Sequence, residues 1–197
     1  MGILACMYVS GNALSQRTQG YSWPLAFLAL ILAGCGARIA PKNAPIPNGG
    51  PLKAQQLPVD FDLPQLNGER VHLADYRGQV VIVIYFTTWC APCAELLPQL
   101  NGLVHGKSAL KNVVTIGVSV DLQPKKLLPA FIDSWGLKLP IALGDSAALH
   151  GRTPFGRLPA VPAVYIVDRA GHHVETLVGT IPNAYLRRRA QTLGAIP

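Results

Sequence analysis

Cysteine is scarce in this chain, with four cysteines among 197 residues. Cys6 and Cys35 lie near the N-terminus, so Cys90 and Cys93 are the only pair in the remainder of the sequence. Cysteines this few and this unevenly placed exclude the class of small domains that are held together by disulfides. Half of the residues are hydrophobic, which is enough for a sizeable core without such cross-links.

Aromatic and acidic residues are also few. Phe, Trp and Tyr make up 7% of the chain, and they do not alternate with basic residues as in a platform that stacks nucleic-acid bases. Ten acidic residues against 17 basic ones leave a formal net charge of +7, part of which comes from Arg187, Arg188 and Arg189. We therefore expect no nucleic-acid partner, and we interpret the charge as an aid to solubility or as loose attraction to anionic lipid.

The chain has no apolar run long enough to span a bilayer. A membrane-spanning helix needs about 20 apolar residues, and the apolar block at residues 23–33 is much shorter. This block fits the hydrophobic region of a signal peptide, with Arg17 as the only charged residue before it. The block ends in Leu32-Ala33-Gly34-Cys35, which resembles the lipobox of bacterial lipoproteins. The resemblance implies a signal peptide at residues 1–34 and a lipid attached to Cys35.

Two alternatives stay open for this N-terminal region. One is a soluble exported protein in which Cys35 is discarded or free, and the other is an uncleaved single-pass anchor, which the short block disfavours. In Gram-negative lipoproteins an acidic residue after the cysteine resembles an inner-membrane retention signal, so Gly36 favours the outer membrane. The expected location is extracytoplasmic, in the periplasm, on a membrane. Residues 35–57 are rich in Pro and Gly without a hydrophobic period, which predicts a flexible tether spanning on the order of 25 Å.

What the chain does have is a Cys-x-x-Cys sequence, Trp89-Cys90-Ala91-Pro92-Cys93. Residues 79–86 before it are apolar without alternation, as in a buried parallel strand, and leucines at helical spacing follow over residues 91–106. The free N–H groups and the dipole of a helix N-terminus favour thiolate over thiol. We therefore predict that Cys90 attacks a partner disulfide and that Cys93, one turn inward, resolves the mixed disulfide.

The cysteine pair is thus expected to be the redox centre itself, with no other cofactor and no metal. A purely structural disulfide is disfavoured, because a ring closed over two intervening residues constrains little loop entropy. A zinc half-site is disfavoured because no second Cys-x-x-Cys exists and His105 is poorly placed.

The remaining sequence predicts one α/β domain over residues 58–197. A small N-terminal hairpin is expected from segments 59–63 and 70–73 around the turn Asn67-Gly68. Further strands and helices are expected in an order that makes a central sheet of parallel and antiparallel strands flanked by helices. The strands are 112–120, 163–167 and 173–178, and the helices are 124–136, 146–150 and 182–193.

A resemblance to a known family covers nearly all of residues 58–190. It is carried by segments 61–64, 67–69, 76–78, 86–93, 117–121 and 162–168, together with Leu73 and Gly171. In these segments the chain resembles the TlpA/ResA branch of the thioredoxin superfamily. The resemblance implies a thioredoxin-like fold and a thiol-disulfide oxidoreductase. Its partners would be thiol or disulfide groups of exported client proteins, such as apocytochrome c, and a membrane thiol protein that donates electrons.

The resemblance also implies a client-binding site. Pro162 matches the family's cis-proline, and the backbone of Val161 would then pair with an incoming client chain. Pro159 is the rival for this role, but the spacing to residues 165–168 favours Pro162. Trp89 is either a contact surface beside the dithiol or a half-buried packing residue.

Between the cysteines, Ala91 and Pro92 are expected to tune the reduction potential, since Pro92 fixes the backbone and lacks an N–H.

The chain departs from the family where a proton carrier is expected. Many relatives carry a glutamate three residues after the second cysteine, where this chain has Leu96. The neighbouring Glu95 lies about 100° around the helix and is expected to be solvated. Thioredoxins proper have a buried aspartate six residues before the first cysteine, where this chain has Ile84. Proton transfer to Cys93 is therefore expected to use water or an unidentified group.

Two other functions compete with the oxidoreductase. A peroxiredoxin-type thiol peroxidase is suggested by Thr87, three residues before Cys90, although Val83 stands where that pattern has proline. A non-enzymatic module that binds copper or another metal generally spaces its cysteines more widely and adds a distant histidine.

Overall fold

The structure is a computed structural model, and it describes residues 58–196. Its centre is a five-stranded sheet with the strand order β5-β4-β3-β8-β9. Strands β3, β4 and β5 are parallel, and β8 and β9 run antiparallel to their neighbours. The bounds are β3 Val80–Phe86, β4 Val113–Ser119, β5 Ile141–Leu143, β8 Ala163–Val167 and β9 His173–Val178. The predicted α/β class with a mixed central sheet is confirmed.

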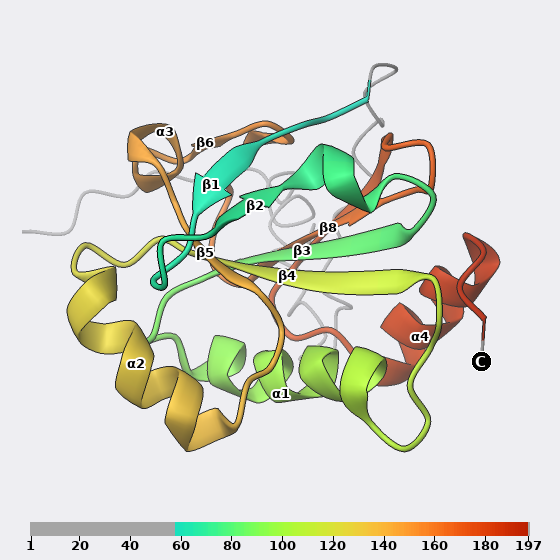
Figure 1. The fold of residues 1–197 in the computed structure, drawn as a ribbon, viewed down its shortest axis with the longest axis horizontal. Helices are drawn as coiled ribbons and strands as arrows, with labels where there is room; N and C mark the ends of the chain where they lie inside the picture. The colour runs from blue at the N-terminus through green and yellow to red at the C-terminus, as the bar shows by residue number, and fades with distance from the viewer. Residues whose placement is uncertain (1–57, 197) are drawn as a thin grey trace, which may run out of the picture. The chain divides into compact units, whose positions relative to one another are not determined.

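Three helices cover one face of this sheet, below it in Figure 1. They are α1 Ala91–His105, α2 Pro124–Trp135 and α4 Asn183–Thr192. The strand β3 alternates its side chains between the two faces, so Ile82 and Ile84 meet the helices and are fully buried there. Leu97 and Leu100 of α1 complete this core, which explains why leucines recur along that helix.

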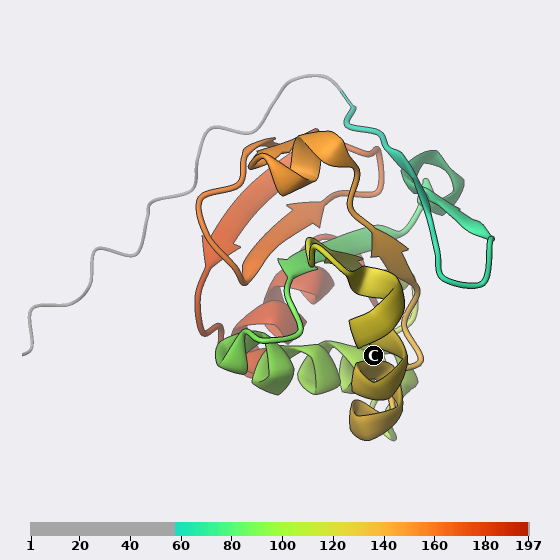
Figure 2. The same cartoon turned by 90° about the vertical axis from the view of Figure 1, so that its left-hand side faces the viewer.

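Smaller elements cover the opposite face, as the turned view shows (Figure 2). They are β1 Asp62–Pro64, β2 Arg70–His72, the 3-10 helix η1 Leu73–Tyr76, α3 Ser146–Leu149, β6 Arg152–Thr153 and β7 Gly156–Arg157. The second core there includes an aromatic cluster of Phe61, Tyr85, Phe155 and Tyr165, with the ring of His173 against it.

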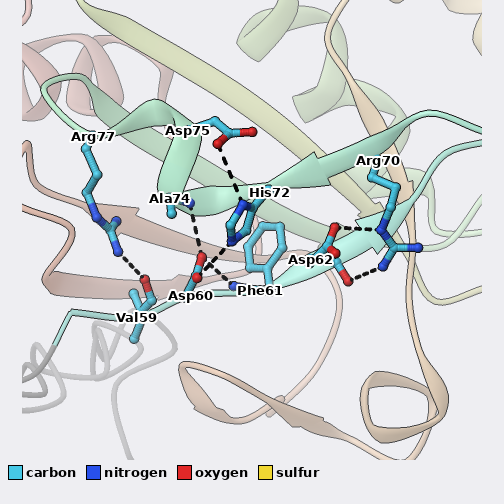
Figure 3. A network of polar contacts seen from close by, with 9 residues as sticks. All are labelled: Val59, Asp60, Phe61, Asp62, Arg70, His72, Ala74, Asp75 and Arg77. Atoms are coloured by element: carbon cyan, nitrogen blue, oxygen red, sulfur yellow. Dashed lines mark hydrogen bonds and ion pairs between the residues drawn. The ribbon is translucent and has the colours of Figure 1, made fainter.

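The N-terminal hairpin forms, but its first strand is placed wrongly by the sequence. The prediction was 59–63, whereas β1 begins at Asp62. The reason is visible in Figure 3. The carboxylate of Asp60 accepts the N–H groups of Phe61 and Ala74 and contacts Nε2 of His72 at 3.0 Å. Residues 60 and 61 are therefore held by hydrogen bonds of the Asp60 side chain, and the paired strand begins only after them, at Asp62.

The predicted signal peptide at 1–34, the lipidation site Cys35 and the tether at 35–57 lie outside the described residues. Between residues 58 and 196, none of the helices combines the length and the apolar character that crossing a membrane would require.

Candidate active site

The two cysteines lie at the N-terminus of α1, directly beyond the carboxyl end of β3. Cys90 is the N-cap residue of the helix, and its Sγ accepts the N–H of Cys93 at 3.2 Å. The two residues form a disulfide, with their Cα atoms 5.2 Å apart. Pro92 occupies the first turn, where a missing N–H leaves no helical bond unmade. The sulfur of Cys90 therefore sits where the helix presents its free N–H groups and the positive end of its dipole.

The two cysteines are both buried, but they differ in their exposure to solvent. Cys90 is 6% exposed and Cys93 is 0% exposed, and both belong to the core under the helices. Ala91 and Pro92 between them are exposed. A partner molecule can therefore approach the site only from the side of Cys90, with Cys93 behind it.

A buried carboxylate holds the loop that leads to Cys90. Asp121 lies two residues after the end of β4 and is 3% exposed. Its oxygens accept the backbone N–H of Thr88 at 3.1 Å, the Oγ1 hydroxyl of Thr88 at 3.0 Å and the Oγ hydroxyl of Ser119 at 2.8 Å. Sequence reasoning placed Asp121 among the family-like residues but gave it no role. An acidic residue directly after a buried strand was the signal that could have identified it.

One buried hydroxyl near the site has no partner among the described residues, namely Oγ1 of Thr87. Thr87 is 3% exposed, and its carbonyl oxygen accepts the N–H of Cys90 at 3.2 Å. A buried hydroxyl without a hydrogen-bond partner costs free energy. Packing alone therefore does not explain why a threonine occupies position 87.

The Val161–Pro162 peptide bond is cis, and Pro162 begins the segment that enters β8. Pro162 is buried and its carbonyl oxygen accepts the N–H of Gly179 at 2.9 Å, whereas Pro159 is exposed. Val161 packs against the core that contains both cysteines. Ala163, the residue after Pro162, pairs with Tyr85 near the carboxyl end of β3, so the proline loop and the Cys-x-x-Cys loop lie at the same end of the sheet.

Exposed apolar side chains border this site. Trp89 is 75% exposed, so it is not a half-buried packing residue. Leu122, next to the carboxylate that binds Thr88, is 88% exposed, and Val178, whose strand partner is Ala163, is 49% exposed. Sequence reasoning missed Leu122 and Val178, because neither has a motif that distinguishes it from an ordinary core residue.

The two positions at which relatives carry an acidic proton carrier are occupied by buried apolar side chains. Ile84 is fully buried in β3 and Leu96 is 2% exposed, while Glu95 is exposed. Over residues 58–196, His, Cys, Asp and Glu side chains form no group of three or more that could hold a metal ion.

Comparison with known proteins identifies the family of this chain. Residues 54–174 match the AhpC/TSA family. The chain belongs to the AhpC/TSA family. The chain is similar to the thiol-disulfide oxidoreductase ResA of Bacillus anthracis, with 29% identity over 120 residues that make up 61% of this chain and 66% of the relative. The chain thus spans slightly less than two thirds of that relative. The thioredoxin-like protein YneN of Bacillus subtilis is 28% identical over 140 residues, which cover 71% of this chain and 79% of YneN.

Solved structures agree on the fold of this AhpC/TSA member. A thiol:disulfide interchange protein of the thioredoxin family from Chlorobium tepidum TLS superposes with a TM-score of 0.62 at 19% identity, covering 72% of this chain and 99% of that one. StoA from Bacillus subtilis gives a TM-score of 0.54 at 22% identity, covering 68% and 98%. The thioredoxin-like fold and the resemblance to ResA that the sequence suggested are confirmed.

Proposed function

We propose that this protein is a membrane-tethered, extracytoplasmic thiol-disulfide oxidoreductase that reduces disulfides of exported client proteins. The observation that carries the proposal is the disulfide between Cys90 and Cys93 at a helix N-terminus, with Cys90 slightly exposed and Cys93 fully buried. Its similarity to ResA, whose name states this activity, supports the same reaction class.

The reaction begins with both cysteines reduced. The thiolate of Cys90 attacks one sulfur of a client disulfide, forming a mixed disulfide and releasing the other client sulfur as a thiolate, which takes up a proton. The thiolate of Cys93 then attacks the sulfur of Cys90. This second step releases the client as a dithiol and leaves the Cys90–Cys93 disulfide. Two electrons have passed to the client, and a membrane thiol protein would restore them by the same exchange in reverse.

The client would bind across the exposed side of the dithiol. Trp89, Leu122 and Val178 offer apolar surface around the cysteines. The backbone of Val161 supplies peptide groups that an extended client segment could pair with, in the manner of an added strand. A disulfide in an unfolded exported chain, such as an apocytochrome c, fits this arrangement because such a segment is free to extend. Ala91 and Pro92 would tune the reduction potential of the pair.

Trapping of the mixed disulfide tests the assignment of roles. In Cys93→Ser, attack by Cys90 proceeds but resolution does not, so a covalent adduct with a disulfide peptide should accumulate and disappear on addition of dithiothreitol. Cys90→Ser should form no adduct at the buried Cys93. Glu95→Gln, an exposed change two residues beyond Cys93, serves as the control and should reduce insulin at the rate of the unmodified chain. Equal trapping by both cysteine variants would refute the roles.

A thiol peroxidase is the second candidate, because Thr87 holds an unpaired buried hydroxyl three residues before Cys90. Family membership alone does not separate the two activities. Hydrogen peroxide consumption by the reduced protein separates them: peroxide turnover faster than insulin reduction would favour the peroxidase. Tight copper binding without dithiol turnover would instead favour a metal-binding module.

Membrane attachment is proposed through a lipid on Cys35, with the outer membrane as the expected site. The support is the lipobox-like sequence that ends at this cysteine. Fractionation of cells that produce Cys35→Ala should move the protein from the membrane fraction to the soluble exported fraction. Unchanged partitioning would contradict lipid anchoring but would leave the thiol chemistry intact.

A further inference from the structure

The end of the sheet opposite the dithiol gathers segments that are far apart in the sequence. Strands β3 and β4 both run toward the dithiol, so the loop between α1 and β4 lies at the opposite end, at the right in Figure 1. Lys111 in this loop pairs with Ile196 near the C-terminus. The turn between β8 and β9 reaches the same end, because the N–H of Gly78 donates to the carbonyl oxygen of Arg169 at 2.8 Å.

Basic side chains cluster on these segments. Arg169 Nε donates to the carbonyl oxygen of Gly78 at 2.7 Å, and a side-chain nitrogen of Arg187 donates to the carbonyl oxygen of Ser108 at 2.8 Å. We call the cluster the basic end, and we define it as Arg77, Lys107, Lys111, Arg169 and Arg187 together with Arg188, the exposed residue that follows Arg187 in α4.

The charge of the described domain is concentrated at the basic end. Three acidic residues lie near it, and each contacts a histidine: Asp60 and Asp75 contact His72, and Asp168 contacts His172. Arg189 is neutralised by Glu175 at 2.6 Å. The rest of residues 58–196 holds six basic and six acidic residues, so it carries no net charge. The whole positive excess of the domain therefore belongs to the basic end.

The chain that precedes the domain joins it at the same place. Pro58 pairs with His172, and the N–H of Val59 donates to the carbonyl oxygen of Gly171 at 2.9 Å. A side-chain nitrogen of Arg77 donates to the carbonyl oxygen of Val59 at 2.9 Å, which fastens this entry to the basic end (Figure 3). In sequence, residues 35–57 contain three basic residues and no acidic one.

We propose that the basic end docks on a membrane surface of anionic lipid headgroups, which turns the dithiol away from the bilayer. The proposed orientation rests on the proposed anchor at Cys35. The chain that leads from this anchor enters the described domain at Pro58, beside the basic end, and this entry favours contact of the basic end with the headgroups. Ile196 is 50% exposed beside Lys111 and adds one apolar contact for the interface. A nucleic acid fits this surface less well, because the large exposed aromatic side chains of the described residues are Trp89 and Trp135, and neither belongs to the basic end.

Hydrogen exchange of the full chain on vesicles tests the docking. The protein is reconstituted into vesicles of phosphatidylcholine alone or with added phosphatidylglycerol, and deuterium uptake is followed in segments 105–112 and 187–196. We expect slower uptake in these segments only with phosphatidylglycerol, while the segment 88–96 around the dithiol is unaffected. Raising the salt concentration to about 0.5 M should abolish the effect, since exposed charges are then screened.

Two triple variants separate the basic end from net charge. Lys107→Gln, Lys111→Gln and Arg188→Gln remove three exposed charges from the basic end. A basic residue close to an anionic surface contributes about fivefold to binding, so this variant should lose on the order of 100-fold of the docked population and with it the protection. The matched control is Lys125→Gln, Lys126→Gln and Arg152→Gln, which removes three exposed charges elsewhere and should keep the protection.

Each contrary result has a definite meaning. Equal uptake on both kinds of vesicle, protection at the dithiol end, or equal loss in both triple variants would overturn the docking surface. Tighter retention of the basic end on single-stranded DNA than on anionic vesicles would replace the membrane by a nucleic acid. If the chain does not stay with phosphatidylcholine vesicles at all, the anchor fails. Salt-sensitive sedimentation with phosphatidylglycerol vesicles would then still support the docking surface.

Discussion

Removal of the buried carboxylate of Asp121 is the sharpest test of how this site is built. In Asp121→Ala the N–H and the hydroxyl of Thr88 lose their acceptor, and so does the hydroxyl of Ser119. Two of these donors belong to Thr88, the residue before Trp89 in the loop that leads to Cys90, and Asp121 itself is only 3% exposed. Water therefore cannot replace the carboxylate without opening the loop.

The size of the effect follows from these three hydrogen bonds. Each hydrogen bond to a charged group contributes about 1.5–3 kcal/mol. Part of that sum is offset, because burial of the carboxylate itself costs free energy in the native protein. We expect Asp121→Ala to lower the free energy of unfolding by about 3 kcal/mol. Asp121→Asn keeps one acceptor oxygen and the shape of the side chain, so its cost should be about half as large.

Urea denaturation of the oxidised protein measures this difference. Asp133→Ala, an exposed aspartate on α2, is the control, and such surface changes usually stay within about 0.5 kcal/mol. Asp121→Ala should also slow insulin reduction, because the loop before Cys90 loses its support. If Asp121→Ala unfolds at the same urea concentration as Asp133→Ala, the carboxylate does not hold the loop and the reasoning is wrong.

Three further predictions concern other parts of the domain. Burial lowers the pKa of His173 from its ordinary value of 6.5, so the unfolded chain binds more protons at mildly acidic pH. The free energy of unfolding should therefore decrease as the pH is lowered from about 7 to about 5. In His173→Phe this decrease should be smaller, as measured by urea titrations at each pH. Trp89→Ala should raise the KM for a disulfide peptide while changing stability by less than about 0.5 kcal/mol, because the side chain is 75% exposed; an unchanged KM would remove Trp89 from the client surface. Leu97→Ala should cost about 2–5 kcal/mol by thermal or urea unfolding, whereas Leu127→Ala, at 39% exposure, should cost far less; equal costs would contradict the assigned core.

Long elements with a strong local pattern could be predicted from the sequence. The apolar run of β3 is buried at every position, so continuous hydrophobicity was a sufficient signal. The end of α2 was also predictable, because Gly136 caps the helix in the left-handed conformation, with φ 56°. The same holds for the start of α1, where a Cys-x-x-Cys sequence with a proline fits a helix N-terminus.

Elements that depend on distant partners could not be predicted in this way. Strand β5 has three residues, too few for a periodic pattern, and it exists because Gly117 of β4 bonds to the segment before it. Strands β6 and β7 are shorter still, and they hold Phe155 against the aromatic cluster. The contact between Thr88 and Asp121 joins positions 33 residues apart, so no local spacing reveals it.

The separation of the dithiol from the basic end follows from strand direction. Because β3 and β4 are parallel, their carboxyl ends meet, and the residues that follow them, Cys90 and Asp121, share one end of the sheet. Strand β8 is antiparallel to β3, so it begins at that same end, where Pro162 enters it. The connections that return the chain to the starts of β3 and β4 must then lie at the opposite end, and they carry Arg77 and Lys111. The order of the elements along the chain is compatible with a dithiol at one end of the sheet and the basic end at the other. Only the strand directions establish this arrangement, and packing across the whole sheet determines those directions.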